Sequence, residues 1–207
     1  MSSYRLLPVC LAFAVLLAVP ASTFGQEVGV KAGINSASLT PLEDQEPDVT
    51  RRLGPVVGIW VRTAPQGRWS FQGEGLFTEK GVEWAFGPDI NVKIRVRYFE
   101  IPLLARADFS SSASRARVFA VGGAAPAFKL SARSTVRFEG EERTSDEDDE
   151  FYGWDVGLVG GLGVEFGRVH VEGRYTHGIR HINTDDNGDE DRVRNRVFTV
   201  TAGFRLR

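Results

Sequence analysis

The sequence predicts an all-β fold: an eight-stranded antiparallel up-and-down transmembrane β-barrel with long outer loops and short periplasmic turns. Two observations predict it. Apolar residues recur at every second position in eight segments of the chain, which is the period of a β-strand. The connections between these segments alternate between long and short, as in barrels whose loops and turns lie on opposite sides of a membrane.

Residues 1–25 are expected to form a cleaved signal peptide, which leaves residues 26–207 as one barrel domain. A basic start precedes an apolar run from Leu6 to Val19 and a stretch of small residues, which is the order of a secretory signal. The run is shorter than the roughly 20 residues that a membrane-spanning helix needs. We favour cleavage after Gly25 over cleavage after Ala21.

Cysteine content and charge exclude several function classes. The only cysteine, Cys10, lies in the apolar run and lacks the small preceding residue of a lipoprotein signal. The mature chain would then have no cysteine, which excludes disulfides, thiol catalysis and cysteine metal sites. The formal net charge of -2 gives no sign of a nucleic-acid partner.

The acidic residues are unevenly distributed along the chain. Most of the 27 acidic residues fall in three short stretches, at 43–48, 139–150 and 185–191. Clustered like charges repel one another and are costly to bury, so these stretches are expected to be solvated loops.

The alternation defines the strands in order along the chain. The eight expected strands cover residues 27–39, 52–63, 68–79, 91–108, 117–131, 151–166, 168–181 and 196–207. The sixth is the clearest: Tyr152, Trp154, Val156, Leu158, Gly160, Leu162, Val164 and Phe166 make one face, and the other face carries glycine, Val159, Asp155 and Glu165. A helix would mix the two sets.

Most of the other strands separate an apolar face from a polar one. The apolar faces hold Leu53, Val57, Ile59 and Val61 in the second strand, Trp69, Phe71 and Phe77 in the third, Val169, Val171 and Tyr175 in the seventh, and Phe198, Val200, Ala202, Phe204 and Leu206 in the last. The fourth strand is irregular because Val92, Ile94 and Val96 have one parity and Phe99, Ile101 and Leu103 the other. A β-bulge near Arg97 would reconcile the two sets.

Long connections are expected at 40–51, 80–90, 132–150 and 183–195, and short ones at 64–67, 109–116 and 166–168. Two features place the apolar face outside, towards lipid. The polar face carries glycine beside charge, which suits the narrow interior of an eight-stranded barrel. Aromatic residues lie towards the strand ends of the apolar face, where a membrane interface attracts them.

A soluble secreted barrel or sandwich is the alternative to a membrane barrel. Such a fold gives no reason for every second loop to be long and acidic, so we favour the membrane barrel. In a membrane the first and last strands must pair, because an open strand edge would leave backbone groups unsatisfied in hydrocarbon.

Five segments carry a resemblance to a known family. They are VGVKAGINSASL from Val28, WSFQGEGLFTEKG from Trp69, YFEIPLLARADF from Tyr98, DVGLVGGLGVEFGRVHVEGRYTHGI from Asp155 and FTVTAGFRLR from Phe198. The chain resembles the outer-membrane β-barrel domain family often labelled porin-family or PorT-like. That resemblance implies that Glu74 and Glu100 point into the barrel, and it leaves open an accessory role in protein secretion.

The polar face is the first candidate for chemistry. It holds Arg52, Arg62, Glu74, Glu100, Arg106, Asp155, Glu165, Glu172, Arg174 and Arg205. This set is compatible with a proton or solute path, but a salt-bridge network that fills the barrel is the favoured interpretation.

Histidine and an acidic loop suggest two further sites, neither of which we favour. His170, Glu172 and Thr176 share a face and resemble parts of a hydrolase site, but His177 and His181 lie on the other face. The loop starting at Asn183 has the first ligands of a calcium loop. Arg194 stands where that site needs a bidentate glutamate.

We therefore expect an integral outer-membrane protein, monomeric and exported, with no catalytic, cofactor-binding or metal-binding residues assigned. Its function would be structural or interactive in the cell envelope, with a plugged interior, and its acidic loops would offer contact to an extracellular ligand or surface partner. The alternatives are a membrane-embedded lipid hydrolase or acyltransferase, and a small passive channel.

Overall fold

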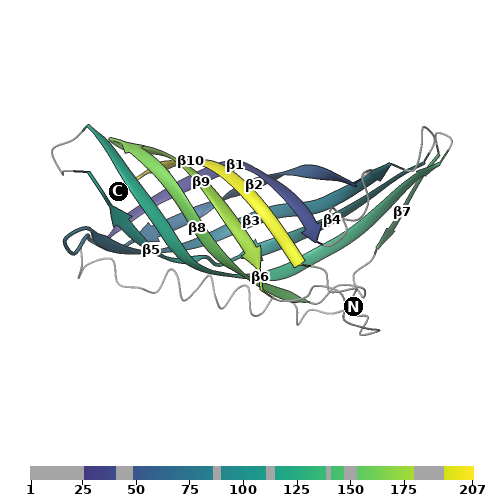
Figure 1. Ribbon diagram of the computed structural model, residues 1–207, viewed down its shortest axis with the longest axis horizontal. Helices are drawn as coiled ribbons and strands as arrows, with labels where there is room; N and C mark the ends of the chain where they lie inside the picture. The colour runs from purple at the N-terminus through teal and green to yellow at the C-terminus, as the bar shows by residue number, and fades with distance from the viewer. Residues whose placement is uncertain are drawn as a thin grey trace.

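The wall of the molecule is closed by the pairing of its first and last strands. The computed structural model describes residues 26–40, 49–85, 90–110, 115–138, 141–146, 153–179 and 194–207. Strand β1 (Glu27–Thr40) runs antiparallel to β10 (Arg194–Arg205), with Gly29 opposite Arg205 and Thr40 opposite Arg194. The expected closure is confirmed, and Figure 1 shows β1 and β10 side by side.

Eight strands form the barrel wall, each antiparallel to its neighbours, and one of the eight is made of two pieces. After β1 come β2 (Val49–Arg62) and β3 (Trp69–Ala85). The fourth strand of the wall consists of two pieces, β4 (Ile90–Glu100) and β5 (Leu103–Asp108). The remaining strands of the wall are β6 (Ala116–Phe138), β8 (Trp154–Phe166), β9 (Val169–Gly178) and β10. A β2–β3 pairing completes the ring, so the predicted eight-stranded antiparallel up-and-down barrel is confirmed.

The fourth strand of the wall is interrupted, whereas the sequence predicted one continuous strand at 91–108. Pro102 lies between β4 and β5 and has no backbone N–H to donate to a ladder. The wall stays closed there, because the Glu74 amide donates to the Pro102 carbonyl at 3.0 Å and the Ile101 amide donates to the Pro126 carbonyl at 2.8 Å.

The predicted bulge is present in register but does not act as expected. The β4–β6 register shifts between Arg97 and Tyr98, and the additional residue, Leu130, lies in β6. Val96 and Tyr98 are both buried, and the alternating Arg95 and Arg97 are exposed, so the parity does not change at the shift. Phe99 is buried as well, so the alternation of burial ends there. Val96, which is buried, and Leu103, which is 58% exposed, therefore lie on opposite faces of the wall. The side chains of Val92 and Ile94 lie outside the described residues.

Two expected long loops are partly strand. Strand β3 continues to Ala85, which shortens the connection expected at 80–90. Strand β6 continues to Phe138 and pairs with β7 (Glu141–Asp146), so a hairpin occupies most of the connection expected at 132–150. In Figure 1, β7 lies at the right end of the barrel, and the C-terminus lies at the opposite end.

The short turns include two glycines in the left-handed region of backbone conformation. Gly67 has φ of 65° and Gly167 has φ of 60°. Most side chains disfavour this region, whereas glycine adopts it without steric cost. No helix within the described ranges is both long and apolar enough to cross a membrane.

The apolar stripe of the strands faces outward and the charged stripe faces inward. In β8, Leu158 and Leu162 are 54% and 66% exposed, whereas Asp155 and Glu165 are 4% and 3% exposed. The same division holds in β10, where Phe198, Val200 and Phe204 are exposed and Thr201 is buried. The predicted polarity of the wall is confirmed by these exposures.

Candidate functional site: the barrel interior

A buried carboxylate, Glu74, occupies the centre of the interior. Glu74 accepts hydrogen bonds from Lys31 Nζ at 2.8 Å, from the two terminal nitrogens of Arg174 at 2.6 and 2.7 Å, and from Gln72 Nε2 at 2.5 Å. All of these side chains are buried. A carboxylate at this depth is tolerable only when cations and donors surround it, as they do here.

The Glu74 layer spans the full width of the lumen. Glu74 lies on β3 and Arg174 on β9, and the ring order places these two strands four positions apart, on opposite sides of the barrel. Glu172, also on β9, forms ion pairs with Arg174 and, at 3.7 Å, with Lys31. Two cations and two carboxylates therefore balance one another at this level.

A second charged layer lies nearer the short turns. Glu165 pairs with Arg62 at 3.1 Å, with Arg106 at 2.8 Å and with Arg117. Arg62 comes from β2 and Glu165 from β8, which are again on opposite sides of the ring. Glu27 extends the layer by pairing with Arg62 and Arg205, and Asp108 extends it by pairing with Arg106.

Aromatic rings fill the space close to the charged layers. Trp60 and His170 meet edge to face with ring centroids 5.4 Å apart, and Phe119 lies 6.2 Å from His170. The Arg106 guanidinium stacks over the Phe119 ring, 3.7 Å from its centroid. Glycines opposite the rings leave room for them, since a Cβ at Gly163 would overlap Phe119.

A small cavity lies inside the barrel, on the long-connection side of the Glu74 layer. Its volume is about 20 Å³, on the order of the space that one water molecule needs. Asn35, Thr78 and Glu100 are among the residues that line it, and Lys80 forms an ion pair with Glu100 there. Asn35 donates to Thr78 Oγ1 at 2.6 Å.

The sequence located most of this interior. Of the ten polar-face residues that it predicted, Arg62, Glu74, Arg106, Asp155, Glu165, Glu172 and Arg174 are buried, and Glu100 and Arg205 are half-buried. The side chain of Arg52 lies outside the described residues. The implied inward orientation of Glu74 and Glu100 is confirmed by their pairing with Lys31 and Lys80.

Sequence reasoning missed several members of the two layers: Glu27, Lys31, Trp60, Arg117 and Phe119. The signal for Lys31 was present, because it alternates with Val30 and Ala32. Trp60 and Phe119 gave no such signal, because residue type alone does not distinguish an apolar ring on the inner face from one on the outer face.

The two histidines that the structure describes, His170 and His177, do not come together in a hydrolase-like arrangement. His170 is buried inside the barrel against Trp60 and Phe119, whereas Glu172 is paired with Lys31 and Arg174. His177 lies beside Tyr175, with ring centroids 6.4 Å apart. His181 and the calcium-like loop that starts at Asn183 lie outside the described residues.

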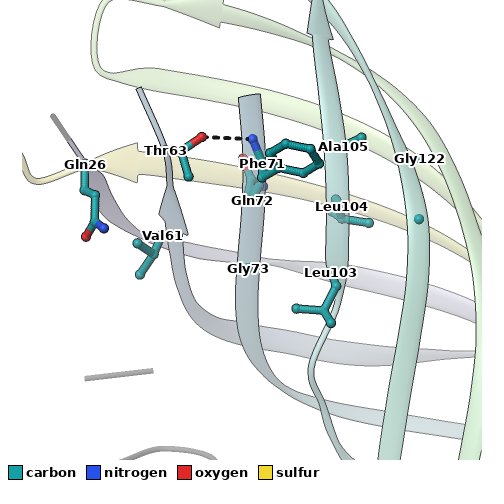
Figure 2. Close-up of a pocket in the computed structure, with 11 residues that line it drawn as sticks. Gln26, Val61, Thr63, Phe71, Gln72, Gly73, Leu103, Leu104, Ala105 and Gly122 are labelled. Carbon is teal, nitrogen blue, oxygen red and sulfur yellow. Dashed lines mark hydrogen bonds between the residues drawn. The ribbon is translucent and has the colours of Figure 1, made fainter. Parts of the chain in front are cut away.

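The outer surface carries a separate apolar groove of about 600 Å³ on β2, β3, β5 and β6 (Figure 2). Phe71 and Leu103 stand at its sides, and Gly73 and Gly122 contribute no side chain to fill it. The Phe71 amide donates to Thr63 Oγ1 at 3.1 Å at one end. Its lining is mainly hydrocarbon, with Gln26, Thr63 and Gln72 also contributing, and a surface of this kind suits a lipid acyl chain.

These features define the class of protein. A closed barrel with an apolar outer surface, aromatic residues towards the ends of that surface and a charged interior is an integral membrane β-barrel. The chain belongs to the outer membrane protein β-barrel domain family, whose profile matches residues 24–183. It is therefore a protein of the outer membrane.

Several solved structures resemble the chain at low sequence identity. One is Ail, the attachment invasion locus protein of Yersinia pestis, solved with the heparin analogue sucrose octasulfate (13% identity, 87% of this chain and 99% of that chain, TM-score 0.43). Others are Neisserial surface protein A (17%, 87% and 96%, 0.46) and the N-terminal barrel of Pseudomonas aeruginosa OprF (8%, 86% and 97%, 0.38). No curated protein matches the chain in sequence.

Proposed function

We propose that the chain is a structural or interaction protein of the cell envelope whose interior is closed to solutes. The observation that carries this proposal is the Glu74–Arg174 pair, which crosses the lumen from β3 to β9. The Glu165–Arg62 pair crosses it at a second level. A hydrated solute would have to break the ion pairs of both charged layers, whose central carboxylates, Glu74 and Glu165, are buried.

We further propose that the acidic connections make the contacts of the protein with its surroundings. The long connections carry the acidic stretches at 43–48, 139–150 and 185–191. In barrels of this class the long loops face the medium and the short turns face the periplasm. These loops would contact cations, surfaces or cationic partner proteins, and the protein would act as a monomer without enzymatic activity.

Planar-bilayer recording tests the closed interior. The purified full chain, inserted into a neutral bilayer, should give no steady conductance above that of a protein-free bilayer. A reproducible single-channel conductance from the wild-type chain would contradict the proposal and favour a passive channel.

Whole-cell proteolysis tests the orientation of the loops. Protease added to intact cells should cut the chain between Ala132 and Glu150. If residues 1–25 are removed, mass spectrometry of the recovered protein should identify Gln26 as its first residue. Cutting only after the outer membrane is opened would place the acidic connections in the periplasm.

A lipid-turnover assay tests the absence of catalysis. We expect the wild-type protein and the double variant His170→Ala/Glu172→Gln to be equally inactive towards phospholipid in mixed micelles. Turnover by the wild type that the double variant lacks would assign an enzyme instead.

A further inference from the structure

The charged side chains of the short turns are all positive. Arg68 lies between β2 and β3, Arg115 between β5 and β6, and Arg168 between β8 and β9, while Arg207 follows β10. All four side chains are exposed. None of the residues between the paired strands at this end is acidic, whereas the long connections are mainly acidic. The short-turn end of the barrel is therefore cationic.

The second charged layer, just inside this end, does not balance these cations. It contains more arginines than carboxylates, namely Arg62, Arg106, Arg117 and Arg205 against Glu27, Asp108 and Glu165. Within the part of the chain that the structure describes, the side chains of Arg68, Arg115 and Arg168 form no ion pair or hydrogen bond. The surplus positive charge is therefore available to an anion from outside the chain.

A cavity of about 430 Å³ lies between the β2–β3 turn and the β5–β6 connection, and we call it the mouth cavity. Its lining includes Arg68, Arg117, Asp108 and Ser110. Asp108 is already paired with Arg106 at 2.8 Å, so its charge is offset. Ser110 Oγ accepts a hydrogen bond from the Val118 amide at 2.9 Å, which leaves the hydroxyl hydrogen free to donate. The cavity thus offers two guanidinium groups and a hydroxyl to an anionic group.

The cations of the mouth cavity are directed to the barrel axis more than to lipid. Arg117 has the parity of the buried Phe119 and pairs with the buried Glu165. Trp69 and Phe166, by contrast, are exposed on the outer face close to the turns, where aromatic rings meet the membrane interface. Lipid headgroups surround that outer face. An anion that reaches Arg117 must therefore approach from the aqueous mouth of the barrel.

We propose that the mouth cavity binds carboxylate groups on the peptide stems of the cell wall and so tethers the barrel to that polymer. Guanidinium groups form paired hydrogen bonds with carboxylates. A polymer that repeats the same group adds avidity to a weak single contact. The tether rests on the proposed orientation, in which the short turns face the periplasm, whereas the binding itself is a property of the purified protein.

Co-sedimentation of the folded protein in neutral lipid nanodiscs with purified cell-wall sacculi tests this. The probes are native sacculi and sacculi whose carboxyl groups have been converted to amides. We expect Arg68→Gln/Arg117→Gln to bind native sacculi on the order of tenfold more weakly than the wild type. The wild type should bind the amidated sacculi as weakly as that variant does. Because Arg117 also contacts Glu165, Arg68→Gln alone is the second variant, and it should lose about threefold.

The matched control is Arg95→Gln/Arg97→Gln, which removes two exposed arginines of β4. It should bind native sacculi like the wild type. Equal binding by the wild type and both mouth variants would overturn the proposal, as would equal loss in the control or undiminished binding to amidated sacculi.

Nanodiscs that contain phosphatidylglycerol separate the cell wall from lipid as the partner. Binding to native sacculi should persist in them, and its loss would assign the arginines to lipid headgroups and overturn the proposal. Heat-modifiable migration in gels verifies that each variant is folded. A failure to bind sacculi leaves the whole-cell proteolysis pattern unchanged, so it is distinguished from a failure of the proposed orientation.

Discussion

At the scale of single residues, Glu74 is the charge on which the interior depends most. It receives hydrogen bonds from three side chains on β1, β3 and β9, and it is fully buried. Because two of these partners, Lys31 and Arg174, are buried cations, removal of the Glu74 charge leaves them poorly compensated.

Glu74→Gln should therefore destabilise the barrel by about 3 kcal/mol or more, the usual cost of breaking a buried ion pair. The measurement is urea unfolding of the folded protein in lipid vesicles, followed by heat-modifiable migration. Glu79→Gln is the matched control: its partner Arg97 is largely exposed, so a change within about 1 kcal/mol is expected. Equal effects of the two substitutions would contradict the role assigned to Glu74.

Inward glycines set the space for the interior rings. A Cβ at Gly163 would overlap the Phe119 ring, whereas a Cβ at Gly160 on the same strand meets nothing within 4 Å. Gly163→Ala should cost about 1–3 kcal/mol through overpacking, and Gly160→Ala should be neutral or slightly stabilising. The same unfolding measurement compares them, and a neutral Gly163→Ala would show that the interior is loosely packed.

At the scale of elements, closure between β1 and β10 is the feature that removes exposed strand edges. Ala32 and Ala202 stand directly opposite each other and both face outward. Their separation in an antiparallel pair suits a disulfide, which needs Cα atoms about 4.4–6.8 Å apart.

Ala32→Cys/Ala202→Cys should therefore cross-link under mild oxidation in the folded barrel. The cross-link is detected as altered migration of the unfolded chain, because the ends of the barrel are then joined. The control pair Ala32→Cys/Ala120→Cys places its second cysteine on β6 and should not cross-link. A failure of the first pair beside an equally reactive control would contradict the closed ring.

The elements differ in how well the sequence predicted them, and the reason is physical. Strand β8 was predicted closely because its inward face is mostly glycine and charge, with Val159 the exception, and its outward face is apolar. The strand made of β4 and β5 was predicted less well, because Val96 and Tyr98 are apolar residues that face the interior. The sequence predicts a loop where β7 forms, because the residues of β7 are polar on both faces and give no alternation.

At the scale of the whole molecule, the sequence predicted the polarity of the wall but not the partners across the lumen. Alternation shows that Glu74 and Arg174 share the inner face. It does not show that β3 and β9 face each other at the same height, which depends on the register of every pairing around the ring. The cross-lumen layers therefore required the structure.

The central claim is that the apolar stripe meets lipid and the charged stripe is enclosed. Single cysteines carrying a fluorophore at Leu158, Val159 and Leu162 test it most directly, in a background with Cys10 replaced and the protein inserted in vesicles of lipids brominated on their acyl chains. Fluorescence at positions 158 and 162 should be strongly quenched by the bromine, and fluorescence at the intervening position 159 should be quenched little. Strong quenching at 159 with little at 158 and 162 would contradict the account.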